Sequence, residues 1–236
     1  MGSCNCINCT HTLCAKKVPI FSFLSDEELA KIVDMTGHKA YKKGDILCSE
    51  GEKSDTLFII NEGGVKLSKL TKDGKEQIVH IFTSGDFFGE LSLFSSGQTY
   101  NFDVYAISDL KICTLTKKDM DKILISNPAI ALKLLEVITK RLTQTENLAQ
   151  NLATKDAEIR IAYILLEFSE KYGVSTAQGL QVNLPINREE MANYAGVTRE
   201  TISRKLTIFE ELGIIQLKGT RVILIKELNM LRSYVE

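Results

Sequence analysis

The chain reads NREEMANYAGVTRETISRKLTIFEELGIIQLKG over residues 187–219, and this stretch decides how its C-terminal part folds. Asn187 can cap a helix, and Glu190 stands at the reciprocal position of a capping box. The small Ala-Gly-Val tripeptide that follows predicts a tight turn, after which Thr198 caps a second helix running to about Leu212. Two helices joined by a short, glycine-containing turn are typical of a helix-turn-helix.

The second of these helices carries side chains suited to reading base pairs. Glu200, Ser203 and Arg204 share one face, because residues three and four apart are neighbours on a helix. A recognition helix presents its N-terminal residues to the major groove, where Arg bonds guanine bidentately and Glu accepts from cytosine N4. Beyond this helix, GIIQLKGTRVILI predicts a hairpin wing whose basic residues can contact phosphate. The expected DNA contacts are Thr198, Arg199, Glu200, Ser203, Arg204, Lys218 and Arg221.

A solvated helix face is the competing interpretation, since Glu and Arg also pair on ordinary exposed helices. Acidic and basic residues are nearly balanced in this part of the chain, so its bulk charge does not support DNA binding. The spacing of the polar residues and the two helix caps nevertheless favour DNA binding.

The composition of the 236 residues excludes several classes of protein. Lys and Arg number 29 and Asp and Glu number 30, and the formal net charge of -1 excludes a polybasic coat protein or a highly charged disordered tail. DNA binding remains open, because it needs only a local basic face. No apolar run approaches the roughly 20 residues of a membrane span, and the N-terminus lacks the apolar stretch of a secretory signal. We therefore expect a cytoplasmic protein.

The residue pattern changes twice along the chain. Ser25 and Glu28 form a capping box, which predicts an N-terminal helix. Between His38 and about Lys117, short β-rich runs alternate with glycines, which favours an antiparallel barrel or jelly roll. A generic β-sandwich fits the same periodicity. After Pro128 the apolar residues recur at helical spacing again.

The helix that follows Pro128 carries an apolar seam. Six of its residues are spaced alternately three and four positions apart, which is the a/d pattern of a helix that pairs with another. We favour pairing with a second copy of the chain over simple packing on the β-roll. Thr and Ala in the middle soften this seam, and a soft dimer interface can be switched. The seam residues are Leu135, Ile138, Leu142, Thr145, Ala149 and Leu152.

The expected architecture is therefore an α+β protein of four parts. A cysteine-rich leader precedes an antiparallel β-roll sensor domain, a long dimerisation helix and a C-terminal winged helix-turn-helix domain that binds DNA. We expect a hinge at about residues 150–157. The expected boundaries of the four parts are 1–17, 18–127, 128–153 and 154–236.

The stretch 187–219 closely resembles the helix-turn-helix of the CRP/FNR superfamily of bacterial transcription regulators. KKGDILCSEGE (42–52), LFIINEGGVKL (57–67) and GDFFGELSLF (85–94) resemble the cyclic-nucleotide-binding β-roll of that superfamily. The similarity covers residues 18–230 in the right order. It implies a homodimer whose winged helices bind palindromic double-stranded DNA, with RNA polymerase as a further partner.

The resemblance also implies roles for single residues of the recognition helix. The matches of Arg199, Glu200 and Arg204 read a TGA-type core in the superfamily, and Ser203 matches a base-contacting serine of the FNR branch. Because Arg199 and Ser203 combine features of two branches, the half-site stays open.

Cyclic nucleotide binding is not expected, although the β-roll resembles a cyclic-nucleotide-binding domain. The family holds the nucleotide phosphate with an Arg shortly after GELxLF, since a guanidinium pairs with phosphate bidentately. This chain has Tyr100-Asn101 where Arg-Ser is expected, and its first arginine anywhere is Arg141. Glu90 survives from the family pattern, either as a turn residue or as a ribose-binding residue.

Four of the six cysteines crowd the N-terminal leader, which in a reducing compartment suggests a metal, an iron–sulfur cluster or a redox switch. The FNR branch implies a [4Fe–4S] cluster with three ligands in the leader and one on a strand before the dimerisation helix. The matching ligands are Cys6, Cys9, Cys14 and Cys113, with Cys4 as a possible substitute. One gap in the leader is a residue shorter than the pattern we expect. Loss of the cluster would weaken dimerisation and DNA binding.

Several alternatives to the cluster remain open. Cys14 and Cys113 can form a dithiol switch, as in some relatives from low-GC Gram-positive bacteria, or zinc can bind the four leader cysteines. Cys113 can also be an ordinary buried strand residue, which is what we expect of Cys48. A regulator whose β-roll binds a small-molecule effector is a further alternative. No nucleophile–base pair, phosphate-binding loop or dinucleotide fingerprint occurs, so we do not expect an enzyme.

Overall fold

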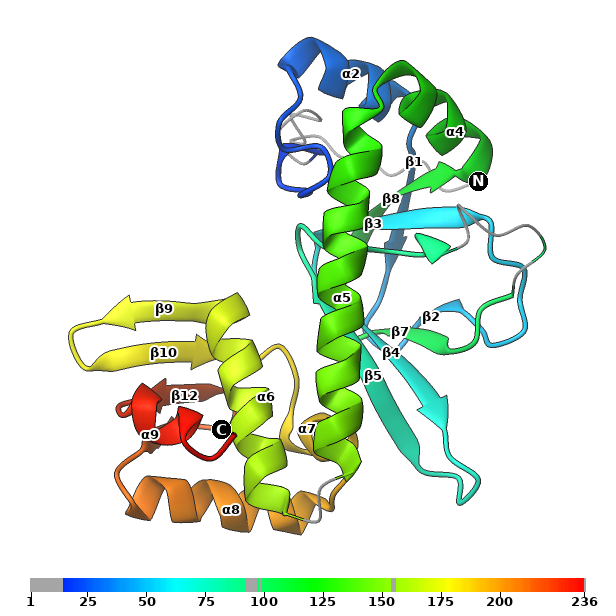
Figure 1. The fold of residues 1–236 in the computed structure, drawn as a ribbon. Coiled ribbons are helices and arrows are strands. Elements are labelled where there is room, and N and C mark those ends of the chain that lie inside the picture. The colour runs from blue at the N-terminus through cyan, green and yellow to red at the C-terminus, as the bar shows by residue number, and fades with distance from the viewer. Residues whose placement is uncertain (1–14, 92–96, 98, 154–155, 236) are drawn as a thin grey trace. The chain divides into compact units, whose positions relative to one another are not determined.

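The computed structural model of the chain describes residues 15–91, 97, 99–153 and 156–235, and for 151 and 152 only the backbone (Figure 1). The chain forms two compact units, each of which is described by itself. The first comprises residues 1–69 and 79–143, and the second 70–78 and 144–236. Across the described residues, the helices are too short or too polar to cross a membrane.

The first unit is built on two four-stranded sheets. Their orders are β1-β8-β3-β6 and β2-β7-β4-β5, and the β1–β8, β3–β8 and β4–β7 pairs are antiparallel. The predicted antiparallel β-roll is therefore confirmed. The strands are β1 (Gly37–Tyr41), β2 (Ile46–Cys48), β3 (Thr56–Glu62), β4 (Gly64–Leu70), β5 (Glu76–Thr83), β6 (Phe87–Phe88), β7 (Asp103–Ala106) and β8 (Leu110–Thr116).

Helices flank this β-roll at both of its chain ends. Helix α2 (Asp26–Asp34) begins with the predicted capping box, in which the Ser25 side chain and the Glu28 carboxylate each accept the other residue's backbone N–H. Helix α4 (Lys117–Ser126) was not predicted; the Thr116 side chain starts it by accepting the N–H of Asp119. Helix α5 (Ala129–Ala153) follows.

Two apolar clusters fill the first unit. One is aromatic, with the rings of Phe58 and Phe88 stacked 4.7 Å apart, and it contains the buried Cys48 thiol as predicted. The other includes Ala15, Cys113 and, from α5, Ile130 and Leu134. This second cluster joins Ala15, at the end of the predicted leader, to strand β8 and helix α5 in one contiguous core.

The second unit contains helices α6 to α9 and a small sheet of order β11-β12-β10-β9. Residues 173–183, which look like a polar connection in the sequence, form the β9–β10 hairpin, because β10 pairs with β12 as well as with β9. Its elements are α6 (Ala157–Tyr172), β9 (Gly173–Thr176), β10 (Gly179–Asn183), α7 (Arg188–Ala195), α8 (Arg199–Glu211), β11 (Ile215–Lys218), β12 (Val222–Ile225) and α9 (Leu228–Arg232).

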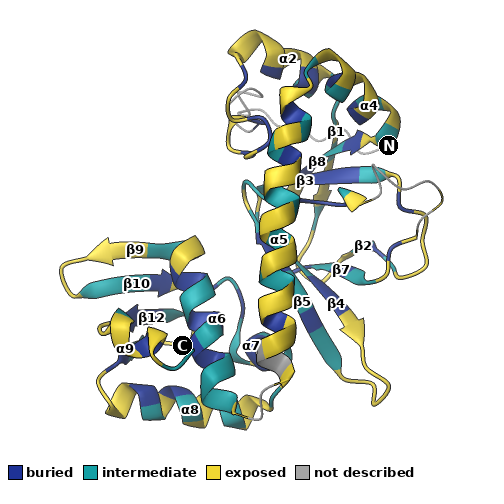
Figure 2. Ribbon diagram, in the orientation of Figure 1, coloured by how far each residue is buried: buried dark blue, intermediate teal, exposed yellow. Residues whose placement is uncertain are grey.

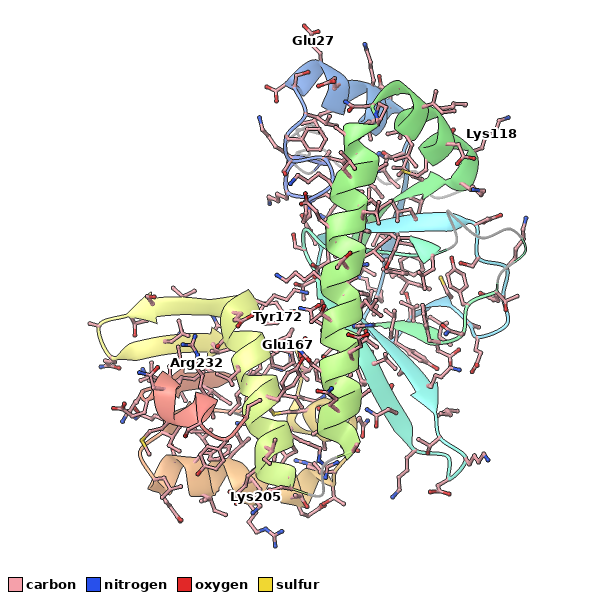
Figure 3. The ribbon with its side chains drawn as sticks, in the orientation of Figure 1. Glu27, Lys118, Glu167, Tyr172, Lys205 and Arg232 are labelled. Carbon is pink, nitrogen blue, oxygen red and sulfur yellow. The ribbon has the colours of Figure 1, made fainter. Side chains whose placement is uncertain are left out.

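A carboxyl group is largely buried between α6 and α7 in this unit. Both oxygens of Glu167 accept the hydroxyl of Tyr194, at 2.9 and 3.1 Å, and Glu167 is labelled in Figure 3. Burial raises the pKa of the Glu167 carboxyl above its ordinary value, although the hydrogen bond from Tyr194 opposes the rise. The folded state therefore holds a proton on Glu167 more tightly than the unfolded chain does.

This carboxyl makes stability depend on pH in a direction opposite to that of a salt-bridged acid. Its contribution to the free energy of unfolding is fully present below its ordinary pKa and is lost as the pH rises through the raised pKa. We expect Glu167→Gln to weaken this dependence and to stabilise the fold near neutral pH by on the order of 1 kcal/mol, since an amide still accepts from Tyr194. Thermal unfolding between pH 4.5 and pH 8 measures it. Glu211→Gln, at an exposed position of α8, is the control; equal pH slopes for the two variants would contradict the assignment.

Candidate nucleic-acid interface and sensor contacts

The helix-turn-helix is formed by α7, a turn and α8, and both predicted caps are present. The Asn187 side chain accepts the backbone N–H of Glu190 at 2.9 Å, and the Glu190 carboxylate accepts that of Asn187. Gly196 ends α7 in the left-handed conformation, with φ of 63°. The Thr198 hydroxyl accepts the N–H of Thr201 and starts α8. The caps place the turn and both helices as the sequence predicts.

Helix α8 has an apolar and a polar face. Ile202, Leu206 and Phe209 are fully buried. The predicted base-reading residues all lie on the opposite, solvent-exposed side of its first two turns. These exposed residues are Thr198, Arg199, Glu200, Ser203 and Arg204. The first turns of α8 can therefore enter a groove without uncovering the core.

The predicted wing is the β11–β12 hairpin, which turns at Gly219 with φ of +78°. Lys218 and Arg221 are exposed on it. The Lys218 ammonium donates to the side-chain oxygen of Gln178 in the β9–β10 turn at 3.0 Å, a contact that leaves its positive charge unneutralised. Both basic groups thus remain able to contact phosphate.

Side chains of α6, which the sequence analysis did not predict, contact the helix-turn-helix. The Arg160 guanidinium donates to the carbonyl oxygens of Ala195 and Gly196, at 3.1 and 3.2 Å. Glu158 pairs with Lys205 of α8, which is labelled in Figure 3. No local sequence pattern predicts these contacts, because each joins residues that are 35 to 47 positions apart in the chain.

In the β-roll, Tyr100 stands where the resemblance places a phosphate-binding arginine. Its ring is buried, and its hydroxyl is hydrogen-bonded to the Cys48 thiol and to Ser54. Burial raises the pKa of Tyr100 and raises that of Cys48 to about 11. Both groups are therefore neutral at physiological pH, and this position offers no positive charge to a phosphate.

The first arginine of the chain, Arg141, extends from α5 to the β-roll. Its guanidinium lies 2.7 Å from the Glu90 carboxylate and stacks on the rings of Phe82 and Phe87, with centroids 4.6 and 4.4 Å away. The side chains of Arg141 and Glu90 are 14% and 12% exposed. Glu90 is thus more than the turn residue that the sequence allowed, since it forms a largely buried ion pair that ties α5 to the β-roll.

Helix α5 buries one face and exposes another (Figure 2). Leu135 and Leu142 of the predicted seam are 60% and 58% exposed, and Ala149 is exposed as well. Ile138 and Thr145 are half-buried, and the Leu152 side chain lies outside the described residues. The seam therefore presents exposed leucines that nothing in the described chain covers.

Cys113 is buried in strand β8 beside two polar side chains. The Asn61 amide donates to its sulfur at 3.0 Å, and His38 Nδ1 lies 3.2 Å from the sulfur. Cys4, Cys6, Cys9 and Cys14 lie outside the described residues. Within the described residues, no three His, Cys, Asp or Glu side chains gather as metal ligands do. Cys113 is thus the member of the predicted ligand set whose surroundings the structure shows.

Family models match both parts of the chain. Residues 38–127 match the cyclic nucleotide-binding domain, and residues 159–234 match the Crp-like helix-turn-helix domain. The β-roll and the helix-turn-helix each fall within one of these matches.

Single relatives extend the similarity across both units. The chain is 33% identical over 187 residues to the cAMP-activated global transcriptional regulator CRP of Pasteurella multocida, covering 79% of this chain and 88% of that protein. It is 24% identical over 219 residues to the anaerobic regulatory protein of Bacillus subtilis, covering 92% of each. The solved structure of FixK2 from Bradyrhizobium japonicum matches with a TM-score of 0.75 and 26% identity, over 85% of this chain and 98% of that one.

Proposed function

Since this chain belongs to the CRP/FNR superfamily of bacterial transcription regulators, we propose that it acts as a homodimer on palindromic DNA and responds to oxygen or redox state. It is a DNA-binding transcription regulator of this type and not an enzyme. The observation that carries the redox proposal is that Cys113 shares one apolar core with α5. RNA polymerase is the further partner that the superfamily implies.

Base reading is assigned to the exposed first turns of α8, and phosphate contact to the wing. Arg204 lies on the exposed face next to Ser203, whereas Lys218 lies on the hairpin. A guanidinium in the major groove discriminates between bases, but an ammonium on phosphate does not. The two side chains should therefore contribute differently to affinity and specificity.

We expect Arg204→Ala to cost about 1–3 kcal/mol on the specific palindrome and to relax its base preference. Lys218→Ala should weaken binding to all duplexes alike and lower the salt slope by about 1. Titrations by fluorescence anisotropy, on a selected palindrome and on a random duplex of equal length, measure both effects. Equal losses on the two duplexes for Arg204→Ala would remove its base-reading role.

Dimerisation is assigned to the exposed seam of α5. A charge within an a/d seam is buried without a partner on association, and this is unfavourable. We expect Leu142→Asp to shift the protein to monomers in sedimentation and to lower its affinity for a palindrome at least about tenfold. Ile125→Asp is the control, because Ile125 on α4 is 82% exposed and lies outside the seam. A dimeric Leu142→Asp variant would refute this assignment.

Several observations support sulfur chemistry as the input. Cys113 supplies a thiol whose neighbours, Asn61 and His38, are polar, and hydrogen bonds to a ligating sulfur tune iron–sulfur clusters. The donor chemistry at this position fits a thiolate ligand. Ala15, which directly follows Cys14 in the chain, lies in the same apolar cluster. The name of the Bacillus subtilis relative also concerns anaerobic conditions.

Cys6, Cys9, Cys14 and Cys113 would hold a [4Fe–4S] cluster, with Cys4 as a substitute ligand. When bound, such a cluster supplies sensitivity of its sulfides to oxidation. The chain's own part is mechanical: Cys113 lies in the same apolar cluster as Ile130 and Leu134, so a displacement of β8 would act on the first turns of α5 through that cluster. A dithiol switch between Cys14 and Cys113 would act on the same core.

Cyclic nucleotides are not the proposed effector. Tyr100 gives the β-roll a neutral, buried side chain at the expected phosphate position. Arg141 is already paired with Glu90. Both observations favour a β-roll that transmits a signal to α5.

We expect the operator occupancy of the wild type to differ between air and argon, and Cys113→Ser to abolish this difference. Cys48→Ala should retain the difference, because Cys48 is buried in the other apolar cluster of the first unit, which also contains Phe58 and Phe88. Iron and sulfide counts on anaerobically purified protein identify the chemistry. An iron-free wild type would exclude the cluster, and thiol titration would then separate a dithiol from zinc. Retention of the oxygen response by Cys113→Ser would refute a role for this cysteine.

A further inference from the structure

The turn between α7 and α8 is held by one side chain of α6. Arg160 donates to the carbonyl oxygens of Ala195 and Gly196, which stand at the C-terminal end of α7. Carbonyls at a helix end lack partners within the helix and carry partial negative charge, so a guanidinium is a suitable donor to them. Gly196 is followed after one residue by Thr198, the cap of α8. Arg160 thus holds the turn that precedes the recognition helix.

A second contact reaches α8 further along its length. Glu158 pairs with Lys205, and these side chains are 24% and 22% exposed. A half-buried pair is less screened by salt and water than a surface pair, so it retains a definite geometry. Lys205 follows Arg204 directly, and it lies on the side of α8 that faces α6 while Arg204 lies on the exposed side. Glu158 thus constrains α8 one residue away from a predicted base contact.

One of these contacts holds the turn that leads into α8, and the other holds α8 itself at Lys205, so together they constrain the direction of the helix more than either does alone. Glu158 and Arg160 lie in the first turn of α6, and α6 is the first helix after α5 in the chain. We propose that Glu158 and Arg160 are positioning residues that together set the orientation of the recognition helix, so that a change in the direction of α6 is carried to α8. This inference rests on the DNA-binding role of α8.

The alternative is a purely structural role, in which the two contacts stabilise the second unit without selecting the orientation of α8. That role lowers the unfolding temperature but leaves the preference for a specific palindrome over a random duplex unchanged. The ratio of specific to non-specific affinity therefore separates the two roles. Exchanging the charges of Glu158 and Lys205 tests for rescue of this ratio, because the double exchange again places opposite charges at the two positions.

The experiment uses the full chain with Glu158→Lys, Lys205→Glu and the double exchange. We expect each single reversal to lower the ratio of specific to random-duplex affinity about tenfold, and the double exchange to recover most of it. Glu170→Lys, an exposed reversal on the same helix, controls for added positive charge and should leave the ratio unchanged. Arg160→Gln should lower the ratio similarly, with partial recovery in Arg160→Lys. Unchanged ratios, or reversals that the double exchange does not rescue, would overturn the proposal.

Amide hydrogen exchange provides a readout that is independent of DNA. We expect Glu158→Lys and Arg160→Gln to speed exchange across residues 199–211 of α8 more than in the β9–β10 hairpin, relative to Glu170→Lys. Wild-type protein without preference for any palindrome would refute the proposed function, and the exchange pattern would still test whether Glu158 and Arg160 position α8. Amide exchange that is accelerated uniformly across the second unit would overturn the positioning role of these two residues.

Discussion

Helix α5 places the guanidinium of Arg141 among aromatic rings of the described β-roll. The position of that helix against the β-roll depends on this contact. The guanidinium meets a carboxylate, Glu90, and two phenylalanine rings, all within contact distance. A largely buried ion pair contributes little net stability, but the loss of either partner leaves an uncompensated charge. The pair therefore specifies where α5 lies against the β-roll more than how strongly it is held. Burial of Ile130 and Leu134 in the apolar cluster stabilises the packing of α5 on the β-roll.

This division of roles gives the proposed signal a route from the β-roll to α5 that needs no nucleotide. Cys113 lies in the apolar cluster that includes the start of α5, whereas Arg141 lies about three turns further along the same helix. In this proposal, a change at the sulfur would act on one end of a helix whose middle is held by the Arg141–Glu90 contact. The motion that such an arrangement favours is a tilt about the Arg141 contact, because packed cores shift between discrete arrangements instead of deforming continuously.

Local chemistry decided what could be predicted from the sequence. The capping boxes at Ser25 and Asn187, the turn at Gly196 and the alternating strands all depend on residues a few positions apart, and the structure confirms them. Helix α4 was missed because its capping residue, Thr116, ends a strongly β-like run. The β9–β10 hairpin was missed because it is stabilised by pairing with β12, far away in the chain.

The same reason explains which parts of the candidate sites were found. The exposed face that carries the predicted base-reading residues follows from helix periodicity, since a face is defined by spacing alone. The contacts of Arg141 and Arg160 join distant segments, and a single sequence contains no signal that pairs them. The sequence indicated only that the β-roll lacked an arginine of its own. That observation became informative once Arg141 was seen beside Glu90.

The two faces of α5 also restrict how its length can change during evolution. Successive residues on a helix differ by about 100° in direction, so Arg141 faces the β-roll while Leu142 belongs to the exposed seam. One residue deleted before this point would turn every following side chain by that angle and place Leu142 where the guanidinium lies. Insertions or deletions within α5 should therefore survive only in steps close to whole turns, such as seven residues, which restore the phase of both faces together.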